Sequence, residues 1–334
     1  LISHITTILY INIIHSIFFT ATIRVRNNQT VKMRLLAIIT AFFIPLVFSQ
    51  SERSEITQGW HQKVGVKNAE AIRRLEEQQL AQRIVGGFVA PVNFHPYLAG
   101  LLIDVIGLSS PSACGGSILT PSRILTAAHC WFDGRFQAVR IQVVLGSPFL
   151  FHGGLRTHVQ ALALHPQYNF RTFANDIAVL YLPVIIRYSD SIQPVTLPYG
   201  DLLTADFSGM TAVAAGYGRY SDHSNPTTNT ITRNVFLDIL PLNKCRAVYG
   251  DMVLDSNICT CGKGGVGICQ GDSGGPLTIR YGGKQVLIGV SSFVALDVNI
   301  LSKVLIKRKA LIFPAHIATY FTIVLRNIII HIFK

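Results

Sequence analysis

The sequence predicts an all-β fold, built as a sandwich or as a pair of barrels, for the stretch from residue 84 to residue 293. Two observations carry this prediction. Short runs rich in β-branched residues recur between Gly, Pro, Asn and Ser, and helical periodicity is nearly absent. The clearest runs cover residues 118–126, 139–145, 177–182, 211–215, 235–240 and 286–292. The stretch is long enough for two closed sheets.

Two apolar stretches of different kinds open the chain. Residues 1–32 contain no initiating Met and match no folded unit, so we expect them to be translated upstream sequence. Residues 33–49 combine a basic start at Arg34, an apolar run and small residues at the end, which is the pattern of a secretory signal peptide. If both stretches were membrane helices, only the first would reach the roughly 20 apolar residues that a bilayer requires. We therefore expect a secreted, extracellular protein.

Residues 50–83 are polar and charged, and they stop at Arg83, where the β-rich region begins with Ile84. Within this stretch, residues 69–82 favour a short, exposed helix. The sharp change of composition suggests processing at Arg83. An ordinary linker can also end in arginine, so this residue alone does not decide the matter.

Charge and cysteine content limit the partners of the protein. The net charge of +12 divides into +5, +2 and +5 for residues 1–83, 84–293 and 294–334. Because the basic charge lies in the flanks and not on the predicted folded region, we expect no nucleic-acid partner. The six cysteines fit a secreted protein with disulfides, and their spacing matches no zinc-ligand pattern. We expect neither a metal nor an organic cofactor.

Three polar residues occupy positions that suit nucleophilic catalysis. Ser273 lies among glycines that allow a tight turn. His129 ends a strand-like run directly before Cys130, and Asp176 leads into the apolar run 177–182. Alone, His129 and Asp176 are more often structural, as a core histidine and a strand-end aspartate, and a motif like that of Ser273 is equally often a polar turn. Together they provide the nucleophile, base and acid that serine catalysis requires.

Four ordered motifs make the chain resemble the chymotrypsin family of serine peptidases. The motifs are Ile84-Val85-Gly86-Gly87, Thr126-Ala127-Ala128-His129-Cys130, Asp176-Ile177-Ala178-Val179-Leu180 and Gly271-Asp272-Ser273-Gly274-Gly275-Pro276. The resemblance covers residues 84–293 and is strongest to insect chymotrypsin-like and collagenase-like digestive peptidases. It implies a peptidase domain of two antiparallel β-barrels with the active site between them.

The resemblance implies a catalytic triad. Ser273 is then the nucleophile, His129 is the base and afterwards the acid, and Asp176 orients His129. The backbone N–H groups of Gly271 and Ser273 form the oxyanion hole. The implied partners are protein or peptide substrates.

The same resemblance implies a zymogen in which residues 50–83 are an activation propeptide. Cleavage after Arg83 by a trypsin-like protease frees the amine of Ile84, which pairs with Asp272 and completes the site. We expect a monomer without a membrane partner.

Substrate preference is implied by four residues that line the primary pocket in this family: Gly267, Ile268, Ser292 and Phe293. Gly267 stands where a carboxylate selects Arg or Lys side chains. Because a buried substrate cation would lack its counter-charge there, we expect a chymotrypsin- or collagenase-like preference and not a trypsin-like one.

The cysteines are paired by the resemblance into Cys114 with Cys130 and Cys245 with Cys259. Cys269 lacks its usual partner, because no cysteine follows it in the chain. Two hypotheses stay open: Cys269 pairs with Cys261, or both are free thiols.

The resemblance ends at Val294. We expect residues 294–334 to be a divergent tail that arose by frameshift or intron read-through, so that the closing strands and the C-terminal helix of the second barrel are missing. Two alternatives to an active secreted enzyme follow. One is a catalytically impaired homologue that binds without cutting, and the other is a membrane-tethered protease held by residues 310–325.

Overall fold

The computed structural model describes residues 58–83, 95–217, 233–261, 273–294 and 318–322. The chain divides into two compact units, Leu1–Ser51 and Glu52–Lys334, and every described residue belongs to the second. The expected upstream sequence, the signal peptide and most of the tail lie outside the described residues. Within the described part, no helix is long and apolar enough to cross a membrane.

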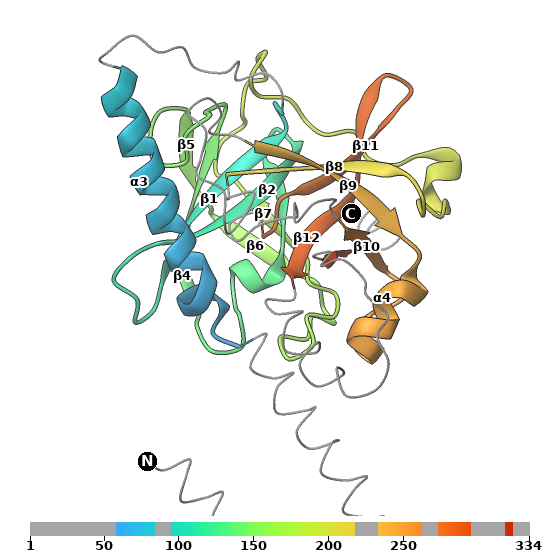
Figure 1. Ribbon diagram of the computed structural model, residues 1–334. Coiled ribbons are helices and arrows are strands. Elements are labelled where there is room, and N and C mark those ends of the chain that lie inside the picture. Colours follow the sequence, from blue (N-terminus) through green and yellow to red (C-terminus); the bar gives the residue numbers. More distant parts are fainter. Residues whose placement is uncertain (1–57, 84–94, 218–232, 262–272, 295–317, 323–334) are drawn as a thin grey trace, which may run out of the picture. The chain divides into compact units, whose positions relative to one another are not determined.

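Seven antiparallel strands form the first sheet, in the order β5-β4-β1-β2-β3-β7-β6 (Figure 1). They are β1 (Leu98–Val105), β2 (Ser112–Thr120), β3 (Arg123–Thr126), β4 (Ala138–Leu145), β5 (Leu155–His158), β6 (Ala161–Leu164) and β7 (Ala178–Tyr181). The central strand β2 is buried at every position from Ser112 to Leu119, because both of its faces are covered. The predicted run 118–126 proves to be the end of β2, a turn at residues 121–122, and β3.

A second antiparallel sheet closes into a barrel, in the order β10-β13-β12-β11-β8-β9. Its strands are β8 (Thr211–Gly216), β9 (Arg233–Leu240), β10 (Asn257–Cys261), β11 (Pro276–Tyr281), β12 (Lys284–Val294) and β13 (Ala318–Thr322), and the helix α4 (Leu242–Tyr249) lies between β9 and β10 in the chain. Inward side chains such as Leu237, Leu277 and Ile288 form its apolar core. The predicted all-β class with two antiparallel sheets is confirmed.

One expectation about this barrel needs correction, because a closing strand is present. Residues 318–322 of the tail form β13, which pairs with β10 through Ile258 opposite Phe321 and with β12 through Val290 opposite Thr322. The physical reason is plain. Thr, Tyr and Phe favour extended backbone, and the edges of β10 and β12 would otherwise present unpaired N–H and C=O groups.

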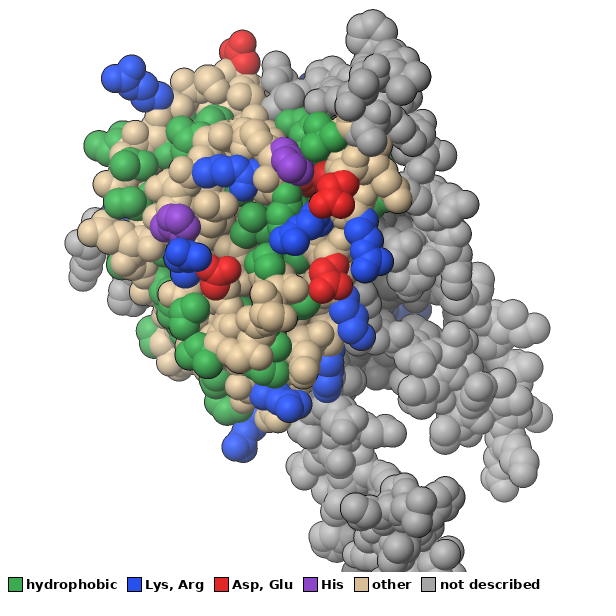
Figure 2. All heavy atoms as spheres, turned by 90° about the vertical axis from the view of Figure 1, so that its left-hand side faces the viewer, with side chains coloured by type: hydrophobic (Ala, Val, Ile, Leu, Met, Phe, Trp, Pro, Cys, Tyr) green, Lys and Arg blue, Asp and Glu red, His purple; other side chains and the backbone are tan. Residues whose placement is uncertain are grey.

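The segment before the β-rich region is also less exposed than its composition suggests. A π-helical turn, η1 (His61–Gly65), runs directly into α3 (Val66–Arg83), which starts earlier than the expected helix. Side chains at positions 60, 64, 69 and 72 are buried, and this spacing puts them on one face. Ala69 and Ile72 pack against residues of β1, β2 and β4. The outer face of α3 carries exposed basic and acidic side chains, and Figure 2 shows both signs on this side of the molecule.

Candidate active site

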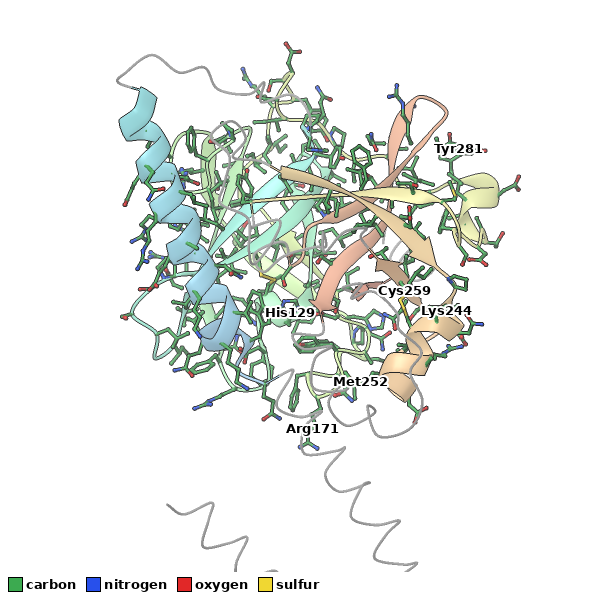
Figure 3. All side chains as sticks on the ribbon, viewed as in Figure 1. His129, Arg171, Lys244, Met252, Cys259 and Tyr281 are labelled. Atoms are coloured by element: carbon green, nitrogen blue, oxygen red, sulfur yellow. A yellow bond between two sulfur atoms is a disulfide. The ribbon has the colours of Figure 1, made fainter. Side chains whose placement is uncertain are left out.

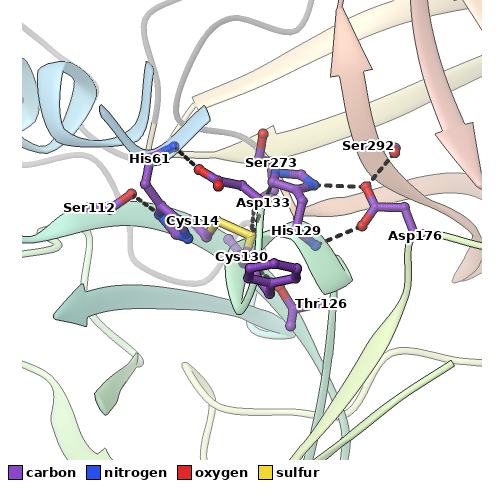
Figure 4. The surroundings of a disulfide bond; sticks show 12 residues. His61, Ser112, Cys114, Thr126, His129, Cys130, Asp133, Asp176, Ser273 and Ser292 are labelled. Carbon is purple, nitrogen blue, oxygen red and sulfur yellow. Dashed lines mark hydrogen bonds and ion pairs between the residues drawn. A yellow bond between two sulfur atoms is a disulfide. The ribbon is translucent and has the colours of Figure 1, made fainter. Parts of the chain in front are cut away.

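His129 is held by covalent and backbone contacts on both sides. It lies in the short 3-10 helix η3 (Ala128–Cys130), which follows β3. The next residue, Cys130, forms a disulfide with Cys114 of β2, so the helix is tied to the central strand of the first sheet (Figure 4). The side chain of His129 therefore projects from a rigid position.

Asp176 precedes β7 and is fully buried, yet three donors satisfy its carboxylate. Oδ1 accepts the backbone N–H of His129 at 2.8 Å, and Oδ2 accepts the Nδ1–H of the same histidine at 2.7 Å. The hydroxyl of Ser292, on β12, donates to Oδ2 at 2.5 Å (Figure 4). Buried carboxylates need such partners. The arrangement fixes the tautomer of His129, because a proton on Nδ1 leaves Nε2 as the basic nitrogen.

The loop that leads to Asp176 is conformationally strained. Phe173 adopts a φ of 53°, which a bulky residue rarely adopts, and Asn175 adopts a φ of 55°, which asparagine tolerates. In this conformation the ring of Phe173 stacks on that of His129, with centroids 5.0 Å apart and an interplanar angle of 11°. The strain thus positions both the carboxylate and one wall beside the imidazole.

Ser273 lies in a turn that is clamped between the two sheets. Its carbonyl accepts the N–H of Gly115 in β2 at 2.7 Å, and the N–H of Gly274 donates to Ser291 of β12 at 2.7 Å. Gly274 has a φ of +81°, and a Cβ at this position would lie 2.5 Å from the Gly115 oxygen. The turn therefore requires glycine. Among the described residues no hydrogen bond joins the Ser273 hydroxyl to His129. The Nε2 of His129 instead lies 3.9 Å from the Sγ of Cys130.

Some of the remaining expected site residues belong to the described part of the chain, and others lie outside it. Gly267, Ile268, Gly271, Asp272 and Ile84 lie outside the described residues. Arg83 is the last residue of α3, and Phe293 lies in β12 without a described side chain. Ser292, which the resemblance assigns to the pocket, has its hydroxyl on Asp176.

Both expected disulfides are present. Besides the bridge at Cys130, one joins Cys245 of α4 to Cys259 of β10, which Figure 3 shows beside α4. Cys261 is the last residue of β10, and its side chain is not described; Cys269 lies outside the described residues.

One cluster has the residue types of a metal site. Potential ligand atoms of Cys114, His129 and Cys130 lie within 4.8 Å of one another. Metal ions bind cysteine as the thiolate, and here both sulfurs are consumed in a disulfide. The cluster therefore lacks the donors that such a site requires.

Four residues near His129 escaped the sequence analysis: Trp60, His61, Ser112 and Asp133. The Trp60 ring meets that of His129 edge to face, with centroids 4.6 Å apart. The N–H of His61 donates to Asp133 at 2.7 Å, and its Nδ1 shares a hydrogen bond of 2.9 Å with the hydroxyl of Ser112 (Figure 4). Burial lowers the pKa of His61 to about 4. The available signal was a single tryptophan in an otherwise polar stretch.

Comparisons with known proteins agree with this geometry. Residues 84–306 match the family model described as Trypsin. A collagenase of Hypoderma lineatum is 35% identical over 214 residues, which are 64% of this chain and 77% of that protein. Brachyurin of Leptuca pugilator is 37% identical over 215 residues, covering 64% and 87% of the two chains.

Solved structures and further relatives extend the similarity. A structure described as HL collagenase superposes with a TM-score of 0.57 and 31% identity, covering 72% of this chain and 93% of the other. Alkaline trypsin B of Manduca sexta is 34% identical over 217 residues, which are 64% of this chain and 81% of that protein. The chain is thus similar both to proteins named for collagen and to proteins named trypsin.

Proposed function

The chain belongs to the trypsin family and is a serine-type endopeptidase, and from this premise we propose that Ser273, His129 and Asp176 form its catalytic triad. The observation that carries the proposal is the buried pair of His129 and Asp176, in which the carboxylate holds Nδ1–H and leaves Nε2 as the base. Ser273 lies in a turn clamped to β2 and β12.

The proposed reaction proceeds through an acyl-enzyme. The Ser273 oxygen attacks the scissile carbonyl carbon while its proton passes to Nε2 of His129. The tetrahedral intermediate collapses, the C–N bond breaks, and the same proton moves to the leaving amine. Water then attacks the ester, with His129 again accepting and returning a proton, and free acid and Ser273 are released. Asp176 stabilises the imidazolium that forms in each half-reaction.

We further propose that the oxyanion is bound by the backbone N–H groups of Gly271 and Ser273. Loss of one such donor typically costs about 3 kcal/mol of transition-state stabilisation. The family's triad and its flanking motif Gly271 to Pro276 support this assignment.

Activation and secretion belong to the same proposal. Residues 33–49 direct secretion, and a trypsin-like protease cleaves after Arg83 so that the amine of Ile84 can pair with Asp272. The peptidase then acts as a monomer. Because Gly267 brings no carboxylate to the primary pocket, the enzyme prefers apolar or aromatic side chains over Arg and Lys.

Hydrolysis by the processed chain tests this function. The full chain, cut after Arg83, should hydrolyse a protein substrate, and the Ser273→Ala variant should lose nearly all of that activity. An Arg83→Gln chain should remain uncut and inactive. Cleavage fastest after Arg or Lys would overturn the specificity, and a well-folded processed chain without hydrolysis would favour the binding homologue.

A further inference from the structure

We propose that residues 58–83, here called the pro-segment, are a non-covalent inhibitor that covers His129 with the indole of Trp60 and must dissociate after cleavage at Arg83. The inference rests on the proposed triad and adds a second control to it. Formation of the new amine at Ile84 completes the site, whereas departure of the pro-segment uncovers it.

The burial of His129 is the first support. A general base in peptide hydrolysis has to contact the leaving nitrogen of the substrate. In this structure 0% of the His129 surface is exposed. Phe173 stacks on one side of the imidazole, and the edge-to-face ring of Trp60, itself 7% exposed, lies 4.6 Å away. Of these two rings only Trp60 belongs to a segment that processing can release.

Specific hydrogen bonds accompany the apolar packing of Trp60. The backbone N–H of His61 donates to Oδ2 of Asp133, while the Oδ1 of this buried aspartate accepts two N–H groups of its own loop. The imidazole of His61 is hydrogen-bonded to Ser112, two residues before Cys114. The pro-segment therefore sits on the surface that borders the Cys114–Cys130 disulfide (Figure 4).

Close backbone approach gives a third contact. Gly65, in η1, lies so near β2 that a Cβ would overlap the hydroxyl of Ser112 and come within 2.7 Å of the Trp60 ring. Glycine at this position is what lets the turn of η1 press against the strand. A methyl group here should push the pro-segment away from the site.

Farther along, α3 is anchored by one carboxylate. Glu76 is fully buried and accepts the backbone N–H groups of Leu150 at 2.5 Å and Phe151 at 2.9 Å. The neighbouring Arg73 lies over the Phe151 ring, 4.6 Å from its centroid. These contacts hold the helix on the first sheet from Trp60 to the last buried turn.

All of these contacts are reversible. The first cysteine of the chain is Cys114, so no disulfide can link the propeptide to the peptidase domain. Once the peptide bond after Arg83 is cut, only packing and hydrogen bonds retain the pro-segment. Its inhibition should therefore depend on concentration, which separates it from an irreversible conformational activation.

The test uses the full chain with an enteropeptidase recognition sequence in place of residues 79–83, so that the cut falls only before Ile84. After cleavage and without separation, hydrolysis per enzyme molecule should rise on dilution and fall when released pro-segment is added back. Trp60→Ala and Gly65→Ala chains should bind the segment about 30-fold or more weakly and be active without dilution. Glu77→Gln, on the exposed face of α3, should behave like the unsubstituted chain.

Two readouts keep this inference distinct from the function itself. Binding is measured by Trp60 fluorescence in a Trp131→Phe chain, which retains one of the two tryptophans. Fluorophosphonate labelling of Ser273 in the separated peptidase reports the function. Labelling without any effect of the pro-segment would overturn the inference alone. Absence of labelling would defeat the proposed function, and the inference would then stand or fall on whether Gly65→Ala, which keeps the Trp60 fluorophore, weakens binding.

Discussion

Replacing Glu76 by Gln should tighten the binding of the pro-segment at alkaline pH. The buried carboxyl accepts two backbone N–H groups and lies near Arg156, yet burial outweighs these contacts and raises its pKa to about 7. Above that pH the bound carboxylate is charged in a poorly solvated place. A neutral amide avoids the cost of this charge, which approaches about 3 kcal/mol at full ionisation, and loses about 1 kcal/mol because its nitrogen cannot accept one of the two backbone N–H groups.

The sign of the pH dependence follows from linkage between protonation and binding. In the bound state the pKa of Glu76 lies above its ordinary value of 4.5. Its favourable contribution to the binding free energy is therefore complete below pH 4.5 and is lost as pH rises through about 7. His61 behaves in the opposite way, because burial lowers its pKa from 6.5 to about 4. Its contribution is complete above pH 6.5 and is lost as pH falls through about 4.

In the unsubstituted chain the opposite pH dependences of Glu76 and His61 nearly cancel. Between pH 4.5 and 6.5, binding adds a proton to Glu76 and removes one from His61, so affinity should change little. Each pKa difference corresponds to about 3 kcal/mol, or on the order of 100-fold in the dissociation constant. In the Glu76→Gln chain only His61 remains, so affinity should rise by about that factor from pH 4 to 6.5 and then stay level.

Dissociation constants of the released pro-segment at about pH 5 and about pH 8 measure both effects. They are obtained from Trp60 fluorescence in the Trp131→Phe background, with Glu77→Gln as the matched control on the opposite face of α3. The expected result is tighter binding of the Glu76→Gln segment at the higher pH. Weaker binding of the Glu76→Gln segment at the higher pH would refute the reasoning, because it would mean that the charged carboxylate stabilises the bound state.

Three further changes test the site and its scaffold. Asp176→Asn should lower kcat about 10⁴-fold with little change in thermal stability, a magnitude taken from the family's triad template; an unchanged kcat would exclude the proposed role. Gly274→Ala should cost more than 3 kcal/mol of stability, because a Cβ there would lie 2.5 Å from a backbone oxygen. Gly283 also has a positive φ, +78°, but open space around it, so Gly283→Ala should cost only about 1 kcal/mol. Equal denaturation midpoints of the two variants would contradict this. Replacing both Cys114 and Cys130 by Ala removes a bridge of sequence separation 16 and should cost about 3 kcal/mol in urea unfolding relative to the oxidised unsubstituted chain. A loss below about 1 kcal/mol would show that the bridge is not a stability element.

The sequence was sufficient for the features that depend on neighbours in the chain. Glycines around Ser273 and the switch into an apolar run at Asp176 are local patterns, and the structure brings the carboxylate of Asp176 to His129. The strand runs were visible because alternation and turn residues lie close together. A run such as 118–126 could not be divided, since the turn at residues 121–122 contains only one strong turn residue, Pro121.

Features that depend on distant pairing were not predictable in this way. Trp60 contacts His129, which lies 69 positions later in the chain. The polar sequence around Trp60 does not indicate which surface the tryptophan packs against. Ser292 reaches Asp176 across 116 positions. The strand β13 closes the barrel although it lies beyond residue 306, where the family match ends, because open strand edges take any compatible extended segment.

Fluorophosphonate labelling of Ser273 before and after cleavage is the most direct test of the account. The intact chain should label slowly, since His129 is buried and we propose that the oxyanion hole forms only after cleavage. Labelling should become fast only after the cut before Ile84 and removal of the pro-segment, and Asp176→Asn should abolish the increase. Equal labelling of intact and cut chains, or fast labelling that survives Asp176→Asn, would contradict the proposed triad and its control.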